Sequence, residues 1–185
     1  EINLDELSFA SLKSLFLSPD FARTRPFRGA RKEIDYVQAA REEGETIVQS
    51  FHAKITKRGG HLFAVTTDVC AMANTNGGVV FIGVPSQPKK APIGVANISR
   101  AINTLRQEIS RGITPNLTCS IDTLSTHGKK VIRINVPRGE DPPYAIDDNK
   151  IFVRDESETT LAVRDEIVQL TRARLTTDTG KSVPR

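Results

Sequence analysis

One segment constrains the fold of this chain more than any other: a cluster of asparagine and glycine that leads into an unbroken apolar run. Residues 74–78 read Asn-Thr-Asn-Gly-Gly, and residues 79–84 read Val-Val-Phe-Ile-Gly-Val. Asparagine and glycine tolerate left-handed backbone angles, so the cluster is expected to end a helix and to turn the chain into a strand. A strand without polar positions is typical of a central strand that helices cover on both faces. The structural turn is assigned to Asn74, Asn76, Gly77 and Gly78.

The spacing of apolar residues predicts five helices. Positions repeated at helical intervals place them at residues 4–16, 30–43, 62–72, 98–109 and 160–174. The helix at 98–109 is expected to begin at Asn97 or Ser99, because both side chains can cap a helix, and to end at Gly112. The last helix is expected to turn Leu161, Ile167 and Leu170 inward.

Strands are predicted between these helices. Alternation with a period of two indicates a strand that begins at Thr46, and paired apolar runs indicate hairpins at residues 117–136 and 144–154. Hairpins make a sheet antiparallel, whereas a strand, a helix and a second strand in sequence allow parallel pairing. The expected fold class is therefore α+β, with a mixed, mostly antiparallel sheet whose buried central strand (79–84) is flanked by helices.

Length and composition favour one compact domain. The chain has 185 residues, of which 38% are hydrophobic and 26% charged, as is typical of globular proteins. We divide it into an N-terminal helix and basic arm (1–29), an α+β domain (30–174) and a flexible polar tail (175–185). No apolar run approaches the roughly 20 residues that span a bilayer, and the N-terminus carries no signal-peptide pattern. We therefore expect a cytoplasmic protein without a membrane partner.

Cysteine and histidine are sparse. Cys70 and Cys119 lie far apart among apolar neighbours, so they are expected to be buried free thiols. His52, His61 and His127 show no ligand spacing with either cysteine, which argues against a zinc site. The sequence also lacks a complete phosphate-binding motif of the nucleotide-binding folds. No metal and no cofactor is therefore expected.

The charge pattern gives the first indication of a partner. The formal net charge is +4, which favours a polyanion such as nucleic acid. Basic residues gather in four clusters: Arg23, Arg25, Arg28, Arg31 and Lys32; Lys54, Lys57 and Arg58; Lys89 and Lys90; and Lys129, Lys130 and Arg133. The alternative for any single cluster is a face that is simply solvated.

The helix end, turn and apolar strand together carry a family resemblance. The run Ala71–Gly78 followed by Val79–Val84 resembles the Alba-like DNA-binding domain of Schlafen proteins and of many bacterial regulators. Further similar segments follow in the order that the family uses: Glu43–Thr46, Ile93–Val95, Ile113–Pro115, Ile134–Pro137, Pro143 with Tyr144, and Ile151–Arg154. The resemblance covers roughly residues 43–170. It implies a nucleic-acid-binding domain, often N-terminal in a transcriptional regulator, with DNA favoured over RNA as the partner.

The same resemblance raises the possibility of a nuclease. Some Schlafen proteins are divalent-metal ribonucleases that use three acidic residues. Glu43 matches the first acid, but Val48 stands at the second position and Pro85 or Ser86 at the third. Valine and proline supply no side-chain oxygen to a hard cation. Although Glu45 and Asp68 could in principle replace the missing acids, we expect a non-catalytic domain and keep a metal-dependent ribonuclease as an alternative.

Six basic residues are the candidates for contact with phosphates. The first choice is the strand end and glycine-rich turn with Lys54, Lys57 and Arg58, the second is the turn with Lys89 and Lys90, and the third is Arg154. Arg154 matches the arginine at the end of the family's strand. Its alternative role is an ion pair within the fold, with Asp155 or Glu156 as neighbours.

The expected mode of binding is contact with the backbone rather than with the bases. Aromatic residues make up 5% of the chain, which argues against a platform for base stacking, and no helix is rich in base-reading side chains. The competing hypothesis is a protein-interaction module, in which the first helix and the arm at 21–32 pack on a second copy to form a homodimer. Convergence of the six candidate basic residues in space would favour nucleic acid, and their scatter would weaken the binding hypothesis sharply.

Overall fold

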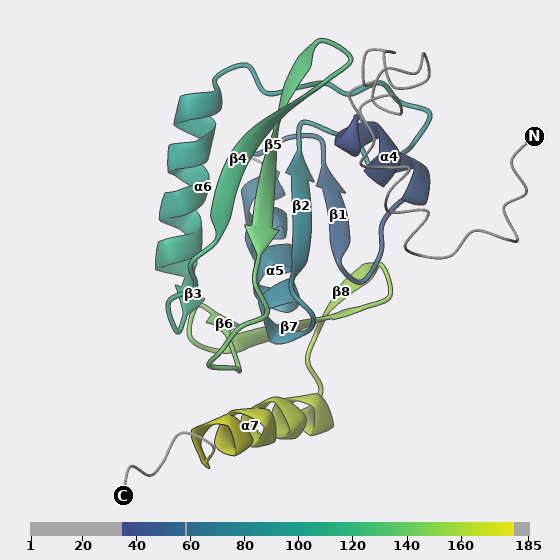
Figure 1. Cartoon of the computed structure of the whole chain (residues 1–185). Helices are drawn as coiled ribbons and strands as arrows, with labels where there is room; N and C mark the ends of the chain where they lie inside the picture. The colour runs from purple at the N-terminus through teal and green to yellow at the C-terminus, as the bar shows by residue number, and fades with distance from the viewer. Residues whose placement is uncertain (1–34, 58, 180–185) are drawn as a thin grey trace, which may run out of the picture. The chain divides into compact units, whose positions relative to one another are not determined.

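The computed structural model describes residues 35–57 and 59–179 (Figure 1). The expected helix at 4–16, the basic arm and Arg58 lie outside the described residues. The helices are α4 (Tyr36–Glu43), α5 (His61–Asn74), α6 (Ile98–Gly112) and α7 (Arg164–Thr179). The strands are β1 (Gln49–His52), β2 (Gly78–Ile82), β3 (Ile113–Thr114), β4 (Ser120–Thr126), β5 (Lys129–Val136), β6 (Ala145–Ile146), β7 (Lys150–Asp155) and β8 (Glu158–Leu161).

The strands form two sheets, which confirms the α+β class. The first sheet has the order β1-β2-β5-β4, with β1 parallel to β2 and the other pairs antiparallel. The second sheet has the order β3-β6-β7-β8 and is antiparallel throughout. Helix α5 packs against one face of the first sheet, and β7 of the second sheet packs on α5 (Figure 1). The predicted strands are present, but they divide between two sheets.

The central strand β2 is covered on both faces, as its apolar sequence predicts. Val80 and Ile82 are fully buried in a large core that includes Met72 of α5. Phe81 points to the opposite face, where it joins a smaller core beneath α4 and stacks on Phe51 of β1, with ring centroids 5.3 Å apart. Each of these side chains stabilises the fold by about 1.5–3 kcal/mol through its burial.

Residues 74–78 make the turn that joins α5 to β2. The Asn74 amide nitrogen donates to the carbonyl oxygens of Tyr144 and Phe152, both at 2.8 Å, while its amide oxygen accepts from the Tyr144 N–H at 2.7 Å. Gly77 has a φ of +72°, and a Cβ atom there would lie 2.7 Å from a backbone nitrogen. The turn therefore needs glycine at this position, and Asn74 ties it to the second sheet.

The C-terminal part differs from the sequence-based expectation. The prediction of a helix from residue 160 is wrong at its start, because Glu158–Leu161 form β8 and pair with β7. Helix α7 runs from Arg164 to Thr179. Just before it begins, the Val163 N–H donates a hydrogen bond to the Glu166 carboxylate at 2.8 Å. Leu161 is exposed in β8 instead of buried in a helix. Although the apolar residues are spaced as in a helix, backbone hydrogen bonds with β7 stabilise a strand here.

Both cysteines are free thiols, as expected, but Cys70 is buried whereas Cys119 is half-buried. Burial raises the pKa of Cys70 to about 12 and that of Cys119 to about 11. In the part of the chain that the structure describes, no helix combines the length and the apolar character that crossing a membrane requires.

Candidate nucleic-acid interface

Two of the predicted basic clusters meet at a surface hollow of about 290 Å³. Lys89 and Lys90 reach it from the loop between β2 and α6, and His127 and Lys129 reach it from the turn between β4 and β5. All four residues are exposed. Arg41 of α4 also lines this hollow, although it is buried. Residues that are far apart in the sequence thus form one basic surface. We call it the lysine surface, and it consists of Arg41, Lys89, Lys90, His127 and Lys129 together with the adjacent Lys130.

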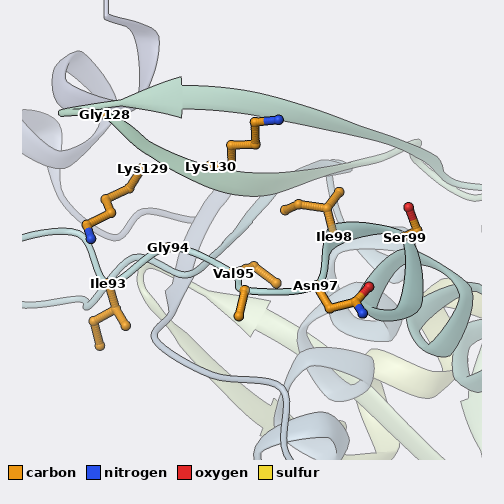
Figure 2. Close-up of a pocket in the computed structure, with 10 residues that line it drawn as sticks. Ile93, Gly94, Val95, Asn97, Ile98, Ser99, Gly128, Lys129 and Lys130 are labelled. Carbon is orange, nitrogen blue, oxygen red and sulfur yellow. The ribbon is translucent and has the colours of Figure 1, made fainter.

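A second hollow, of about 640 Å³, adjoins the first at Lys129. Figure 2 shows Lys129 and Lys130 on the β4–β5 hairpin, with the loop that carries Ile93 to Ser99 on the other side. This loop ends in the first turn of α6, where the Asn97 side chain accepts a hydrogen bond from the Arg100 N–H at 3.0 Å. A helix start carries partial positive charge, so the first turn of α6 adds to the positive charge of Lys129 and Lys130 around this hollow.

Backbone hydrogen bonds fix the loop beside the hairpin. The N–H groups of Ile93 and Gly94 both donate to the Gly83 carbonyl at 2.9 Å, and the Val95 N–H donates to the Lys130 carbonyl at 2.8 Å. Gly94 has a φ of +77°, and a Cβ atom there would lie 3.1 Å from the Cβ of Lys129. This close approach places the two lysines against the loop.

The four lysines of the lysine surface have no ion-pair partner among the described residues, whereas the Asp35 carboxylate lies near enough to His127 for the two charges to interact. No Asp or Glu lines either hollow, and none lies within ion-pair distance of Lys89, Lys90, Lys129 or Lys130. Arg133, in the same sequence cluster as the last two lysines, behaves differently because Asp122 of β4 binds it through two hydrogen bonds of 2.6 and 3.0 Å. The lysine surface is therefore able to bind an external anion without first breaking an internal ion pair.

The structure does not bring Lys57 to the lysine surface. Lys57 forms an exposed ion pair with Glu108 at 2.9 Å and lines a different hollow, together with Asp147. Glu108 lies ten residues beyond the start of α6, which corresponds to roughly 15 Å along the helix axis. Lys54 is exposed, and Arg58 lies outside the described residues.

Arg154 lies inside the protein, so its guanidinium is not available to a phosphate on the surface. It is 4% exposed. Its nitrogens donate to the carbonyl oxygens of Thr46 at 2.8 Å and Gln49 at 2.9 Å, and to the Thr159 hydroxyl at 3.1 Å. An ion pair within the fold was the expected alternative, but the acidic partner is Asp68 of α5, at 3.5 Å, rather than Asp155 or Glu156.

Asp68 is the centre of this internal cluster. Burial by itself would raise the pKa of Asp68, but the hydrogen bond and charge of His52, the Thr159 hydroxyl and the Arg154 guanidinium together lower it below its ordinary value. The His52 Nε2 lies 2.8 Å from one carboxylate oxygen, and the Thr159 hydroxyl donates to the other at 2.8 Å. The cluster connects α5 with β1, β7 and β8.

The residues considered for a nuclease centre lie in different settings. Glu43 is exposed at the end of α4, the Glu45 carboxylate accepts a hydrogen bond from the Phe51 N–H at 3.3 Å, and Asp68 belongs to the internal cluster. Within residues 35–57 and 59–179, no three histidine, cysteine, aspartate or glutamate side chains are grouped so that they could hold a metal ion.

Sequence reasoning identified Lys129 and Lys130 as a basic cluster but did not select them for binding, and it did not select Arg41. Their shared hollow depends on two loops and α4 meeting in space. The doubled lysines at 89–90 and 129–130, each in a predicted turn, were the available signal for the exposed part of the surface. Arg41 carries no such signal, because a lone arginine in a polar helix is most simply solvated.

Comparison with known proteins agrees with this fold. The DIP2311 protein from Corynebacterium diphtheriae is similar in structure, with a TM-score of 0.55, 19% identity, and coverage of 75% of this chain and 31% of that chain. The N-terminal domain of a RecG-related protein from Nitrosomonas europaea gives a TM-score of 0.46 at 16% identity, over 56% of this chain and 74% of that chain. No curated protein matches the sequence.

The chain corresponds to less than a third of the length of the DIP2311 protein. A family model also matches the sequence: the description "Schlafen, AlbA_2" applies to residues 41–163, which are more than half of the chain. This range contains α5, the glycine turn and both sheets, and it includes the whole lysine surface. The chain therefore belongs to the Schlafen AlbA_2 family.

Proposed function

We propose that this domain binds the phosphate backbone of nucleic acid, with DNA as the preferred partner, and that it does so as a non-catalytic part of a transcriptional regulator in the cytoplasm. The observation that supports the proposal is the lysine surface: two adjoining hollows that meet at Lys129 and have no acidic residue in their lining. Membership of the Schlafen AlbA_2 family supports a role connected with nucleic acid.

The chemistry of the surface favours phosphates over bases. Lysine ammonium groups neutralise phosphate charge and release counterions, which supplies a driving force that does not depend on sequence. Phe81 and Phe51 are buried, and no phenylalanine, tyrosine or tryptophan lines either hollow; the imidazole of His127 is the one aromatic ring among the described residues that line them, so the surface is not a base-stacking platform. The domain is therefore expected to recognise charge and shape and to discriminate little between sequences.

The non-catalytic part of the proposal rests on the residues at the expected acidic positions. Val48 and Pro85 supply no ligand oxygen from their side chains. Asp68, one of the two possible substitutes, is already held by His52, Thr159 and Arg154. A divalent cation would have to displace these partners before it could bind to Asp68 in a catalytic arrangement.

Fluorescence anisotropy with labelled duplex DNA, single-stranded DNA and RNA of equal length tests the proposal. We expect binding to duplex DNA that weakens steeply as the salt concentration rises, with the probe intact after incubation with magnesium or manganese. Cleavage that depends on the metal would replace the proposal with the ribonuclease hypothesis. Absence of binding at low salt would favour the protein-interaction module, and a dimer detected by light scattering would then support that hypothesis.

A further inference from the structure

Arg41 has an unusual environment for a charged residue. It is 6% exposed, and its Nη2 donates to the Pro88 carbonyl at 2.7 Å and to the Lys90 carbonyl, while Nη1 donates to the Gln38 side chain at 3.4 Å. Its Nε is buried without a hydrogen-bond partner. Every partner of this guanidinium is neutral, and no carboxylate among the described residues lies within ion-pair distance of it.

A buried cation without a counter-ion is costly, because neutral hydrogen-bond acceptors replace only part of the hydration that is lost. Two carboxylates in the neighbourhood are engaged elsewhere. Asp35 caps α4 and accepts from the Thr126 hydroxyl at 2.7 Å, and Glu42 accepts from the Gln38 amide at 3.0 Å. An anion that entered the hollow lined by Arg41 would supply the missing negative charge.

The lysine surface is arranged around this arginine. Arg41 holds the carbonyl groups on both sides of Lys89, so it fixes the loop from which Lys89 and Lys90 reach the hollow. Lys129 and His127 complete the lining from the hairpin. This density of positive charge distinguishes the hollow from the larger one beside it, where the charged lining residues are Lys129 and Lys130.

From these observations we infer that the hollow lined by Arg41 binds the terminal phosphate of a nucleic-acid strand, while the rest of the strand crosses Lys129 into the larger hollow. A terminal phosphate carries about −1.5 to −2 charges at neutral pH, whereas an internal phosphodiester carries about one. The end of a strand therefore gains more from this hollow than its interior does. The inference rests on the proposed function, because it assigns a specific part of the ligand to one part of the same surface.

Three single-stranded oligonucleotides of one sequence test the inference: one with a 5′-phosphate, one with a 3′-phosphate and one with hydroxyl groups at both ends, each with an internal fluorophore. With the wild-type chain, we expect one phosphorylated oligonucleotide to bind about fivefold more tightly than the hydroxyl-ended one. The measured quantity is this ratio of affinities, because general loss of positive charge weakens all three complexes together.

The Lys89→Ala/Lys90→Ala variant should reduce the ratio of affinities to about one, because it removes two positive charges from the hollow. It leaves the Arg41 side chain unchanged. A matched control, Lys150→Ala/Arg164→Ala, removes two exposed cations outside both hollows and should keep the wild-type ratio. Arg41→Gln should also reduce the ratio of affinities to about one, and circular dichroism checks that this variant is folded.

Equal affinity of the wild-type chain for all three oligonucleotides would overturn this inference alone. Failure to bind any of them by a chain that still binds duplex DNA would also overturn this inference alone, whereas failure to bind duplex DNA as well would contradict the proposed function.

Discussion

Two buried arginines show how similar local geometry can support different roles. Arg154 and Arg41 are 4% and 6% exposed, and each donates to two backbone carbonyl groups of a neighbouring segment. Arg154 also has a carboxylate, Asp68, at 3.5 Å. Arg41 has none among the described residues and lies at the wall of a hollow with exposed lysines.

The two arginines therefore differ in whether a carboxylate lies beside the buried guanidinium. The guanidinium of Arg154 is balanced inside the fold, where it connects β7 with the segment around β1 and with α5. No acid within residues 35–57 and 59–179 balances the charge of Arg41, which lines a surface hollow. Burial alone does not distinguish a structural arginine from one at a binding site, whereas the balance of charge does.

The largest expected effect is on stability. Arg154→Ala should lower the free energy of unfolding by about 3–5 kcal/mol, because it leaves Asp68 without its cation and two carbonyl groups without their donor. Arg41→Ala should cost only about 1–2 kcal/mol, because it leaves no buried opposite charge behind. Urea denaturation of both variants measures the difference. Equal losses would show that the two arginines have the same structural role.

The second effect is on binding. Lys129→Ala/Lys130→Ala should lower the slope of log affinity against log salt concentration by about 2, one for each phosphate contact that is lost. Both side chains are exposed, so the free energy of unfolding should change by no more than about 0.5 kcal/mol. Anisotropy titrations at four salt concentrations measure the slope. A slope equal to that of the wild type would remove these lysines from the interface.

Acid should weaken the internal cluster through the Asp68 carboxylate. The folded-state pKa of Asp68 is lowered, so its contribution to stability is present above the unfolded-state pKa of about 3.9 and is lost as the pH falls through the folded-state value. Asp68→Asn should therefore be less stable at pH 7 and should show a shallower loss of stability as the pH falls below about 4. A loss as steep as that of the wild type would place the acid-sensitive group elsewhere.

The smallest effect is expected for Lys57→Ala. The ion pair with Glu108 is exposed, and such pairs contribute about 0–1 kcal/mol to stability. Because Lys57 lies in a different hollow, its removal should leave the salt dependence of binding within error of the wild type. A reduction of the slope by about 1 would extend the interface along α6 and would return Lys57 to the position that the sequence suggested.

The fold was predictable where the signals are local. The turn at 74–78 and the apolar run after it specify β2 through backbone preference and lack of polarity, and the Asn97 cap specifies the start of α6. The strand β8 was not predictable in this way. Its residues have helical spacing, and they become a strand only because β7 offers them backbone partners.

The candidate site was predictable only in part, for a related reason. The sequence shows which turns carry lysines, but tertiary contacts decide that the turn at 89–90 meets the hairpin at 127–130 and not the turn at Lys57. Arg41 lies in an unremarkable sequence context, and Arg154 was selected through the family resemblance, which did not indicate its burial. Which of them finds an acid depends on α5, and this information is absent from the local pattern.

The most direct test of the account is a titration of the isotopically labelled chain with duplex DNA, followed by two-dimensional NMR of the backbone amides. We predict that the amide shifts change at residues 89–99 and 127–130, which form the two hollows, while the residues around Asp68 and Arg154 stay unchanged. Shift changes centred on residues 61–68 and 147–161 would contradict the assignment of the lysine surface as the nucleic-acid interface.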